Sequence, residues 1–284
     1  FSTADGSVGL NLVNPSDTHL GLFLFYFLWA AGTLKAALFW LYLWQLKEYH
    51  IGRFIDHFRT AQGKRIIFLY ITQFFVWRLK KPTFTFKTIL LATITILITG
   101  GYFIVVLENT PSLFQMLITL VAYNLFIPII ISAIVLSVQP FFVLARNATL
   151  KKATLKRVQF PQLKVIGITG SYGKTSTKEF LKTILSEKFS VLATDKHKNS
   201  EMGVAQTILQ NLNQKHEIFI VEMGAYKKGG IKLLSNIVKP EIGVVTGVNE
   251  QHLALFGSLD NLLSAEGGRE LLVKLPEHGL LVVN

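Results

Sequence analysis

Hydrophobic positions are distributed differently in the two halves of this chain. Up to about residue 145 they form long runs, whereas beyond Leu163 short apolar runs alternate with segments of mixed polarity. A hydrocarbon layer of ~30 Å needs roughly 20 apolar helical residues to cross it. Three stretches meet this requirement, at about 20–46, 88–107 and 113–136. Residues 1–145 are therefore predicted to form a membrane region with three transmembrane helices.

A shorter apolar run covers residues 66–77 and has basic residues on both sides. It is too short to span a bilayer and is predicted to lie in the membrane interface. Residues 1–19 and 108–112 contain no Lys or Arg. The positive-inside rule therefore places these two segments outside and the second half of the chain in the cytoplasm. The prediction is a multi-pass protein of the bacterial inner membrane, with the lipid bilayer as a partner.

Beyond Leu163 the pattern predicts an α/β fold. Strands are expected at 163–169, 190–194, 217–223, 241–248 and 279–283, and helices at 174–187 and 203–212. Such alternation favours a mostly parallel sheet with helices on both faces, and ligands bind such sheets at the carboxyl ends of the strands. This domain is assigned to residues 164–284, after a basic linker at 146–163.

Composition and charge agree with this division. The chain is 50% hydrophobic and only 16% charged, and its formal net charge is +12. Of the 29 Lys and Arg residues, nine lie between Lys47 and Lys87 and six between Arg146 and Lys164, beside the apolar runs. This placement suits an anionic membrane face, and no basic module typical of nucleic-acid binding is present. The absence of cysteine excludes disulfides, cysteine-ligated zinc and thiol catalysis.

A phosphate-binding loop is predicted where the first strand meets its helix, in the sequence Gly170-Ser171-Tyr172-Gly173-Lys174-Thr175. Glycines let the backbone turn tightly, and a helix N-terminus favours anions. Lys174 would reach the β- and γ-phosphates, and the Thr175 hydroxyl would bind Mg²⁺. The usual Walker A spacing would place glycine where the chain has Ile168, so the loop is a shorter variant.

An acid is expected close to this loop. The strand at 217–223 delivers Glu222 at its carboxyl end. A carboxylate there can hold Mg²⁺ directly or through water, as the Walker B acid does. A solvated strand-end glutamate is the competing interpretation.

Four motifs together resemble the Mur ligase family, in that family's order. They are the P-loop Ile168-Thr169-Gly170-Ser171-Tyr172-Gly173-Lys174-Thr175-Ser176, Thr194 with Asn199-Ser200-Glu201-Met202-Gly203-Val204, Glu222-Met223-Gly224-Ala225, and His252-Leu253 with Phe256-Gly257-Ser258-Leu259. The last two most resemble the branch that adds D-alanyl-D-alanine to UDP-muramoyl tripeptide. The resemblance covers about residues 165–284.

The resemblance implies an ATP-dependent amide-bond ligase of peptidoglycan precursor synthesis. The γ-phosphoryl group of ATP would pass to a substrate carboxylate, and an amine would attack the resulting acyl phosphate. The P-loop residues Gly170 to Ser176 and Asn199 would contact ATP, phosphate or substrate. Thr175 and Glu222 would bind one Mg²⁺, and His252 a second. Lys174 and His252 are the catalytic candidates.

Two departures from the family bear on this expectation. Glu266 stands where the family has a carbamylated lysine that helps hold the second Mg²⁺, and a glutamate would offer a permanent carboxylate. The competing interpretation is an exposed helical glutamate. The family's UDP-binding N-terminal domain has no visible counterpart, and its C-terminal ligase domain would lie beyond Asn284. The chain is therefore expected to be a fragment that is inactive by itself.

Two alternatives remain open from the sequence. A ligase similar to poly-γ-glutamate synthase would also join a membrane segment to such a nucleotide domain. A non-catalytic, nucleotide-binding membrane scaffold is the other alternative, and Lys174 together with Glu222 argues against it. A ligase similar to the lipid-linked isoglutaminyl synthase would need a cysteine-based zinc ribbon, which this chain cannot form.

Overall fold

The computed structural model describes residues 15–49, 51–60, 63–66, 80–110, 112–225 and 227–284. The chain divides into two compact units, Phe1–Phe141 and Phe142–Asn284. The predicted interfacial segment 66–77 lies outside the described residues, apart from Ile66.

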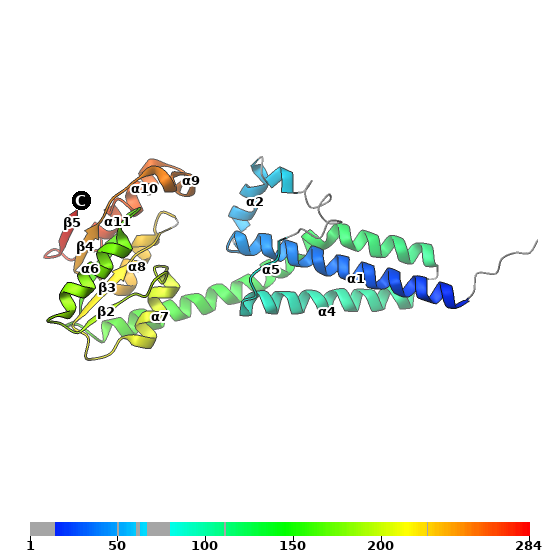
Figure 1. Ribbon diagram of the computed structural model, residues 1–284, viewed down its shortest axis with the longest axis horizontal. Helices are drawn as coiled ribbons and strands as arrows, with labels where there is room; N and C mark the ends of the chain where they lie inside the picture. The colour runs from blue at the N-terminus through cyan, green and yellow to red at the C-terminus, as the bar shows by residue number, and fades with distance from the viewer. Residues whose placement is uncertain (1–14, 50, 61–62, 67–79, 111, 226) are drawn as a thin grey trace, which may run out of the picture. The chain divides into compact units, whose positions relative to one another are not determined.

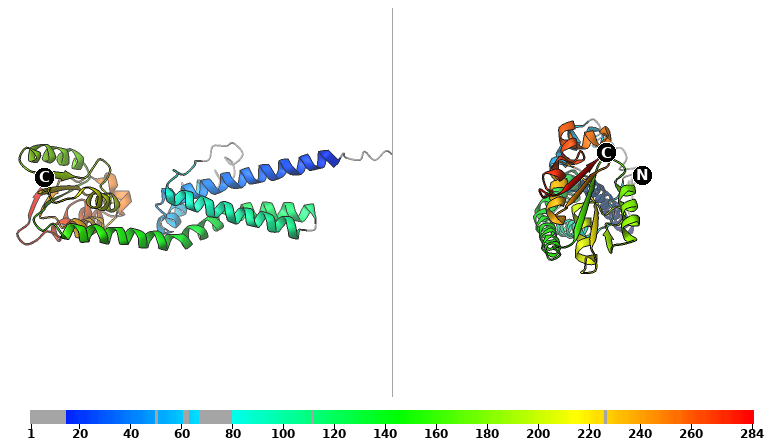
Figure 2. Two further views of the ribbon diagram at one scale, coloured as in Figure 1. Left: turned by 90° about the horizontal axis from the view of Figure 1, so that it is seen from below. Right: turned by 90° about the vertical axis from the view of Figure 1, so that its left-hand side faces the viewer.

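Three long helices form the first unit. In Figures 1 and 2, α1 (Pro15–Leu46), α4 (Phe86–Asn109) and the first part of α5 (Leu113–Val158) lie side by side. The Trp29 indole N–H donates a hydrogen bond of 2.8 Å to the backbone oxygen of Leu120, which ties α1 to α5. By length and composition alone, these helices are long and apolar enough to cross a membrane. The short helix α2 (Ile51–Arg59) follows α1.

Helix α5 differs from the expected element. It begins at Leu113 as predicted but continues to Val158, through most of the stretch expected to be a linker. Its last part belongs to the second unit, where Leu150, Ala153 and Arg157 are buried. Their spacing of three and four residues places them on one helical face, so packing against the second unit's core accounts for the extension.

A five-stranded parallel sheet organises the second unit. The strands are β1 (Lys164–Thr169), β2 (Val191–Ala193), β3 (Ile218–Glu222), β4 (Ile242–Val245) and β5 (Leu280–Val283), in the order β2-β3-β1-β4-β5. All four pairings are parallel. The five predicted strands and their parallel arrangement are thereby confirmed.

Each face of the sheet packs against helices, so the second unit has three layers (Figure 1). Ile166 and Ile168 of β1 point to the face that α6 (Lys174–Ser186) covers. Val165 of β1 points to the opposite face, as the period of two in a strand requires. That second face is covered by α7 (Glu201–Asn211), α8 (Gly230–Val238), α10 (Leu259–Ala265), α11 (Arg269–Leu272) and the end of α5.

A buried carboxylate joins α11 to the start of α8. Glu270 accepts hydrogen bonds from the backbone amides of Gly229 at 2.6 Å and Lys232 at 3.0 Å. The first amides of a helix have no partner within the helix, and a negative charge there is favoured by the helix dipole. Glu270 therefore fixes α8 against the helices that precede β5.

Candidate functional site

The turn after β1 occupies the carboxyl end of the sheet and is held by the loop after β4. Gly170 has φ of +140°, and a Cβ atom there would lie 2.3 Å from Oγ1 of Thr246. The backbone amide of Ser171 donates to the Gly247 oxygen at 2.7 Å, and the Thr246 hydroxyl donates to the Tyr172 oxygen at 2.6 Å. Only glycine fits at position 170, because the two loops approach so closely.

Helix α6 begins directly after this turn with its first amides available to a ligand. Its N-cap is Gly173, with φ of +79° and no side chain to bind the amides of the first turn. Lys174 lies at the same point, and its ammonium group donates to the backbone oxygens of Gly170 and Ser171. Unpaired amides and a cation in one place form an anion-binding site.

A buried carboxylate faces this turn from the neighbouring strand. Glu222 ends β3 and is 4% exposed. The Thr175 hydroxyl donates to its Oε2 at 3.0 Å, and Asn199 Nδ2 donates to its Oε1 at 3.2 Å. The backbone amide of Glu222 donates to the Thr194 hydroxyl at 3.1 Å, which ties β3 to the end of β2. Three residues predicted from the sequence therefore lie together at the sheet edge.

Lys178 also reaches Glu222, and the sequence analysis missed it. It lies in α6 with its side chain fully buried, and its Nζ is 3.5 Å from Oε2 of Glu222. A signal was present, because Lys178 shares its spacing with Leu181 and Leu185, which pack on the sheet. A lysine within an inward-facing apolar stripe indicates a buried partner.

A second cluster surrounds Glu266, at the end of α10. The Ser171 hydroxyl donates to its Oε2 at 2.5 Å, and Nδ1 of His252 lies 2.9 Å from its Oε1. Glu266 is 3% exposed, so the reading as an exposed helical glutamate is wrong. Its carboxylate links the P-loop to the segment that contains His252.

The first cluster, formed by Thr175, Asn199 and Glu222, opens onto a cavity of about 410 Å³. The loop after β2 forms part of the cavity wall. It contains an ion pair of 2.9 Å between Asp195 and Lys198, and this contact lowers the pKa of Asp195. The residues that line the cavity come from the P-loop, the loop after β2 and the end of β3: Ser171, Tyr172, Gly173, Lys174, Thr175, Ser176, Lys196, His197, Asn199 and Glu222. Lys196 and His197 were not predicted. They add basic groups to a cavity that already holds Lys174.

The four predicted metal ligands fall into two pairs, Thr175 with Glu222 and His252 with Glu266. Within the described part of the chain, no group of three or more His, Asp or Glu side chains gathers that could hold a metal ion. Mg²⁺ commonly binds through one or two protein oxygens and completes its shell with phosphate and water. Each pair suits such an ion better than a cage made of protein alone.

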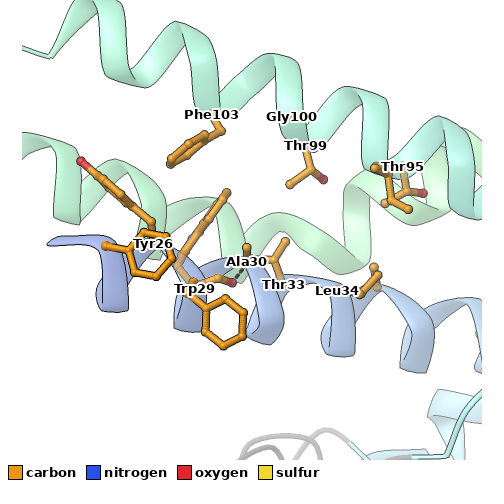
Figure 3. Close-up of a pocket in the computed structure, with 13 residues that line it drawn as sticks. Tyr26, Trp29, Ala30, Thr33, Leu34, Thr95, Thr99, Gly100 and Phe103 are labelled. Atoms are coloured by element: carbon orange, nitrogen blue, oxygen red, sulfur yellow. Dashed lines mark hydrogen bonds between the residues drawn. The ribbon is translucent and has the colours of Figure 1, made fainter. Parts of the chain in front are cut away.

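The first unit has a cavity of different character, about 490 Å³ in volume, between α1 and α4. Figure 3 shows Tyr26, Trp29 and Phe103 around it, and the rings of Trp29 and Phe103 stack with centroids 5.4 Å apart. Its lining is apolar apart from hydroxyl and indole groups. Several of these groups form hydrogen bonds within the unit; the Thr33 hydroxyl, for example, donates to the backbone oxygen of Trp29. Among the described residues that line this cavity, none is an acid, a lysine, an arginine or a histidine.

Comparison with known proteins matches this unit to one family. Residues 168–284 match the Mur ligase middle domain. Over 120 residues the chain is 42% identical to the UDP-N-acetylmuramoyl-tripeptide--D-alanyl-D-alanine ligase of Synechocystis, covering 42% of this chain and 26% of that protein. Identity to the Escherichia coli ligase of the same name is 36% over 128 residues, or 45% of this chain and 27% of that one.

A solved structure is also similar. The MurF ligase from Thermotoga maritima in complex with ADP shares 33% identity, covers 49% of this chain and 31% of its own, and has a TM-score of 0.45.

These comparisons correct the predicted localisation. The matching relatives are soluble enzymes of the cytoplasm, and apolar helices alone do not establish a multi-pass membrane protein. The prediction of a multi-pass protein of the inner membrane is therefore wrong, and the bilayer is withdrawn as a partner.

The family match lies within the second unit, at residues 168–284. The chain spans about a quarter of the length of the curated relatives it matches. Their similarity begins at the P-loop strand and includes both clusters described above. The similarity of this chain to the Mur ligase family is therefore shown for residues 168–284, which match that family's middle domain.

Proposed function

We propose that the second unit binds ATP with Mg²⁺ and serves an amide-bond ligase. The observation that carries the proposal is the hydrogen bond of 3.0 Å between Thr175 and Glu222, beside the P-loop lysine. It brings a hydroxyl, a buried carboxylate and an anion-binding turn to one sheet edge. These are the parts that P-loop enzymes use to hold a triphosphate with its metal.

Each group has a defined part in this proposal. Lys174 would leave the carbonyls of Gly170 and Ser171 and pair with the phosphates, while the first amides of α6 bind their oxygens. Thr175 and Glu222 would hold one Mg²⁺, which neutralises phosphate charge when bound. Asn199 restrains Glu222 and faces the same cavity.

His252 and Glu266 are proposed to hold a second Mg²⁺ near the acceptor carboxylate. Glu266 is buried, fixed by Ser171 and supplies its charge without chemical modification. The hydrogen bond between Nδ1 of His252 and Glu266 leaves Nε2 of the ring for the ion.

The proposed reaction joins a muramoyl-peptide carboxylate to an amine such as that of D-alanyl-D-alanine. A carboxylate oxygen attacks the γ-phosphorus of ATP and ADP leaves, giving an acyl phosphate. The amine then attacks the acyl carbon, phosphate leaves, and the amine loses a proton. Phosphoryl transfer needs positioning and charge neutralisation more than covalent help, which suits these residues. The substrates are proposed from the names of the relatives.

Substrate dependence of ATP consumption tests this function. The complete protein is expected to release phosphate from ATP only when UDP-muramoyl tripeptide and D-alanyl-D-alanine are both present. Polyglutamate with glutamate serves as the competing pair. Turnover with the second pair alone would move the assignment to a polyglutamate ligase. ATP binding without turnover with either pair would favour a non-catalytic role.

The Glu266 position gives a second, smaller prediction. Glu266→Gln keeps the size of the side chain but removes its charge, so the second ion loses a ligand and His252 loses its anionic partner. We expect a roughly 10- to 100-fold rise in the Mg²⁺ concentration that gives half-maximal turnover. Glu277→Gln, which changes an exposed glutamate in the turn before β5 and outside both clusters, is the control. An unchanged Mg²⁺ requirement in Glu266→Gln would remove the second site.

A further inference from the structure

Lys178 is a buried charge of the second unit that lies at the proposed site and has no part in the proposed reaction. Its side chain has no exposure to solvent, although a lysine is almost never fully buried without a partner. The neighbouring inward positions of α6 are occupied by Leu181 and Leu185. An apolar side chain would continue this stripe, so packing alone does not account for a lysine here.

The surroundings of Lys178 connect three elements at the site. Its ammonium group donates to the backbone oxygen of Thr194 at 2.8 Å, just after β2. It lies 3.5 Å from Oε2 of Glu222 at the end of β3, and 3.2 Å from Oε1 of Glu179 in its own helix. The side chain of Glu179 is 47% exposed, whereas that of Glu222 is 5% exposed. Glu222 is therefore the partner that is shielded from water with it.

Both oxygens of Glu222 are restrained. Asn199 binds Oε1, and Oε2 is shared by the Thr175 hydroxyl and Lys178. If Thr175 were to ligate a metal ion, its hydroxyl would be shared between that ion and Glu222. Lys178 would then be a second group that holds Oε2 in place. An ion pair is stronger in a buried site than in water, so the orientation of the carboxylate depends on this contact.

We propose that Lys178 is a positioning residue that holds the carboxylate of Glu222 in the orientation that binds magnesium. It acts through Glu222 and touches neither nucleotide nor metal. Outer partners of this kind fix the geometry of a metal ligand. The inference rests on the proposed function, because it assigns to Lys178 a part in the same nucleotide and metal site.

The test compares nucleotide binding with and without metal in the whole chain. A fluorescent ATP analogue is titrated in the presence of Mg²⁺ and in the presence of EDTA, and the ratio of the two affinities gives the magnesium gain. Lys178→Met should lower this gain about 10- to 100-fold and leave binding in EDTA nearly unchanged. Lys178→Arg keeps a cation and should recover most of the gain. Lys182→Met, at an exposed position one turn along α6, is the matched control.

A double variant separates positioning from a general effect on folding. Glu222→Gln alone should lose the magnesium gain, and adding Lys178→Met should cause no further loss, because Lys178 acts only through Glu222. The double variant also removes both buried charges together, so it is expected to fold even if Lys178→Met alone does not. A further loss in the double variant, equal to that of Lys178→Met alone, would overturn the inference.

Other results have equally definite meanings. An unchanged or larger magnesium gain in Lys178→Met overturns the inference, and a larger gain would mean that the lysine opposes the metal by charge repulsion. If Lys178→Met does not fold, Lys178→Arg takes its place in the test. A magnesium gain in Lys178→Arg as low as that in Glu222→Gln also overturns the inference. A wild-type chain that binds no nucleotide overturns the proposed function and this inference together. If the wild-type chain binds the nucleotide and Lys178→Met has the same magnesium gain, the inference is overturned and the proposed function is not.

Discussion

Replacing Lys174 by alanine is expected to weaken binding of ATP in the presence of Mg²⁺ by about 100-fold, a factor similar to the loss in rate when one donor to a developing oxyanion is removed. Its ammonium group donates to the P-loop oxygens of Gly170 and Ser171. Those contacts place the charge where phosphates would enter. In the proposed substrate assay, ATP consumption by the complete protein should fall below detection.

The stability of the second unit should change little in this variant. Lys174 is partly exposed and supports no buried acceptor outside its own loop, so a change within about 0.5 kcal/mol is expected. Isothermal titration with ATP and Mg²⁺ measures the affinity, and thermal unfolding measures the stability. Lys182→Ala is the control for loss of a cation from the same helix. An ATP affinity of Lys174→Ala within threefold of the wild-type value would contradict the proposed nucleotide site.

Much of the second unit follows from local pattern. Strands buried on both faces read as short apolar runs, and β1, β3 and β4 were found within a few residues of their expected bounds. The P-loop was identified because Gly170 and Gly173 stand between an apolar strand and a helix, where the structure places both at positive φ. Glu222 followed from its place at a strand end. These features depend on neighbouring residues and on the periodicity of one element at a time.

Features that depend on distant contacts could not be predicted. Periodicity does not give the order of strands, so the position of β1 between β3 and β4 was not anticipated. The contact between Ser171 and Glu266 joins residues 95 positions apart, and no local pattern reports it. Glu266 was identified only from its place after a family motif. Lys178 was missed because a lysine in a helix is ordinarily taken to be exposed.

The helical first half shows another limit of sequence reasoning. Runs of apolar residues located all three long helices, because length and hydrophobicity are local properties. They did not give the end of α5, where burial of residues within the second unit accompanies the extension of the helix past the last apolar run to Val158. They also led to a localisation that the comparisons contradict. The composition of a helix shows that it is long and apolar, but the environment around the helix must be established by other observations.

Replacing Arg157 by methionine is expected to destabilise the second unit by about 2 to 6 kcal/mol. The guanidinium group is 5% exposed and donates to three backbone oxygens, those of Val238 at 2.8 Å, Phe160 at 2.8 Å and Leu163 at 3.0 Å. Methionine fills similar space but leaves the oxygens of Val238 and Leu163 without this donor, whereas the Phe160 oxygen still accepts from the Leu163 amide at 3.2 Å. A buried acceptor left unsatisfied costs about 1 to 3 kcal/mol, so these two together give the expected range.

Hydrogen exchange in β1 and β3 of the whole chain measures this loss in the second unit. All four Trp residues lie in the first 77 positions, so tryptophan fluorescence during urea unfolding reports on the first unit and should be unchanged. Lys152→Met, which removes an exposed cation from the same helix, is the matched control. A loss below about 1 kcal/mol would mean that water replaces the guanidinium group at these oxygens. The larger loss would show that the buried Arg157 contributes a large share of the free energy that holds the end of α5, through its contacts with the turn that leads into β1 and with the end of α8.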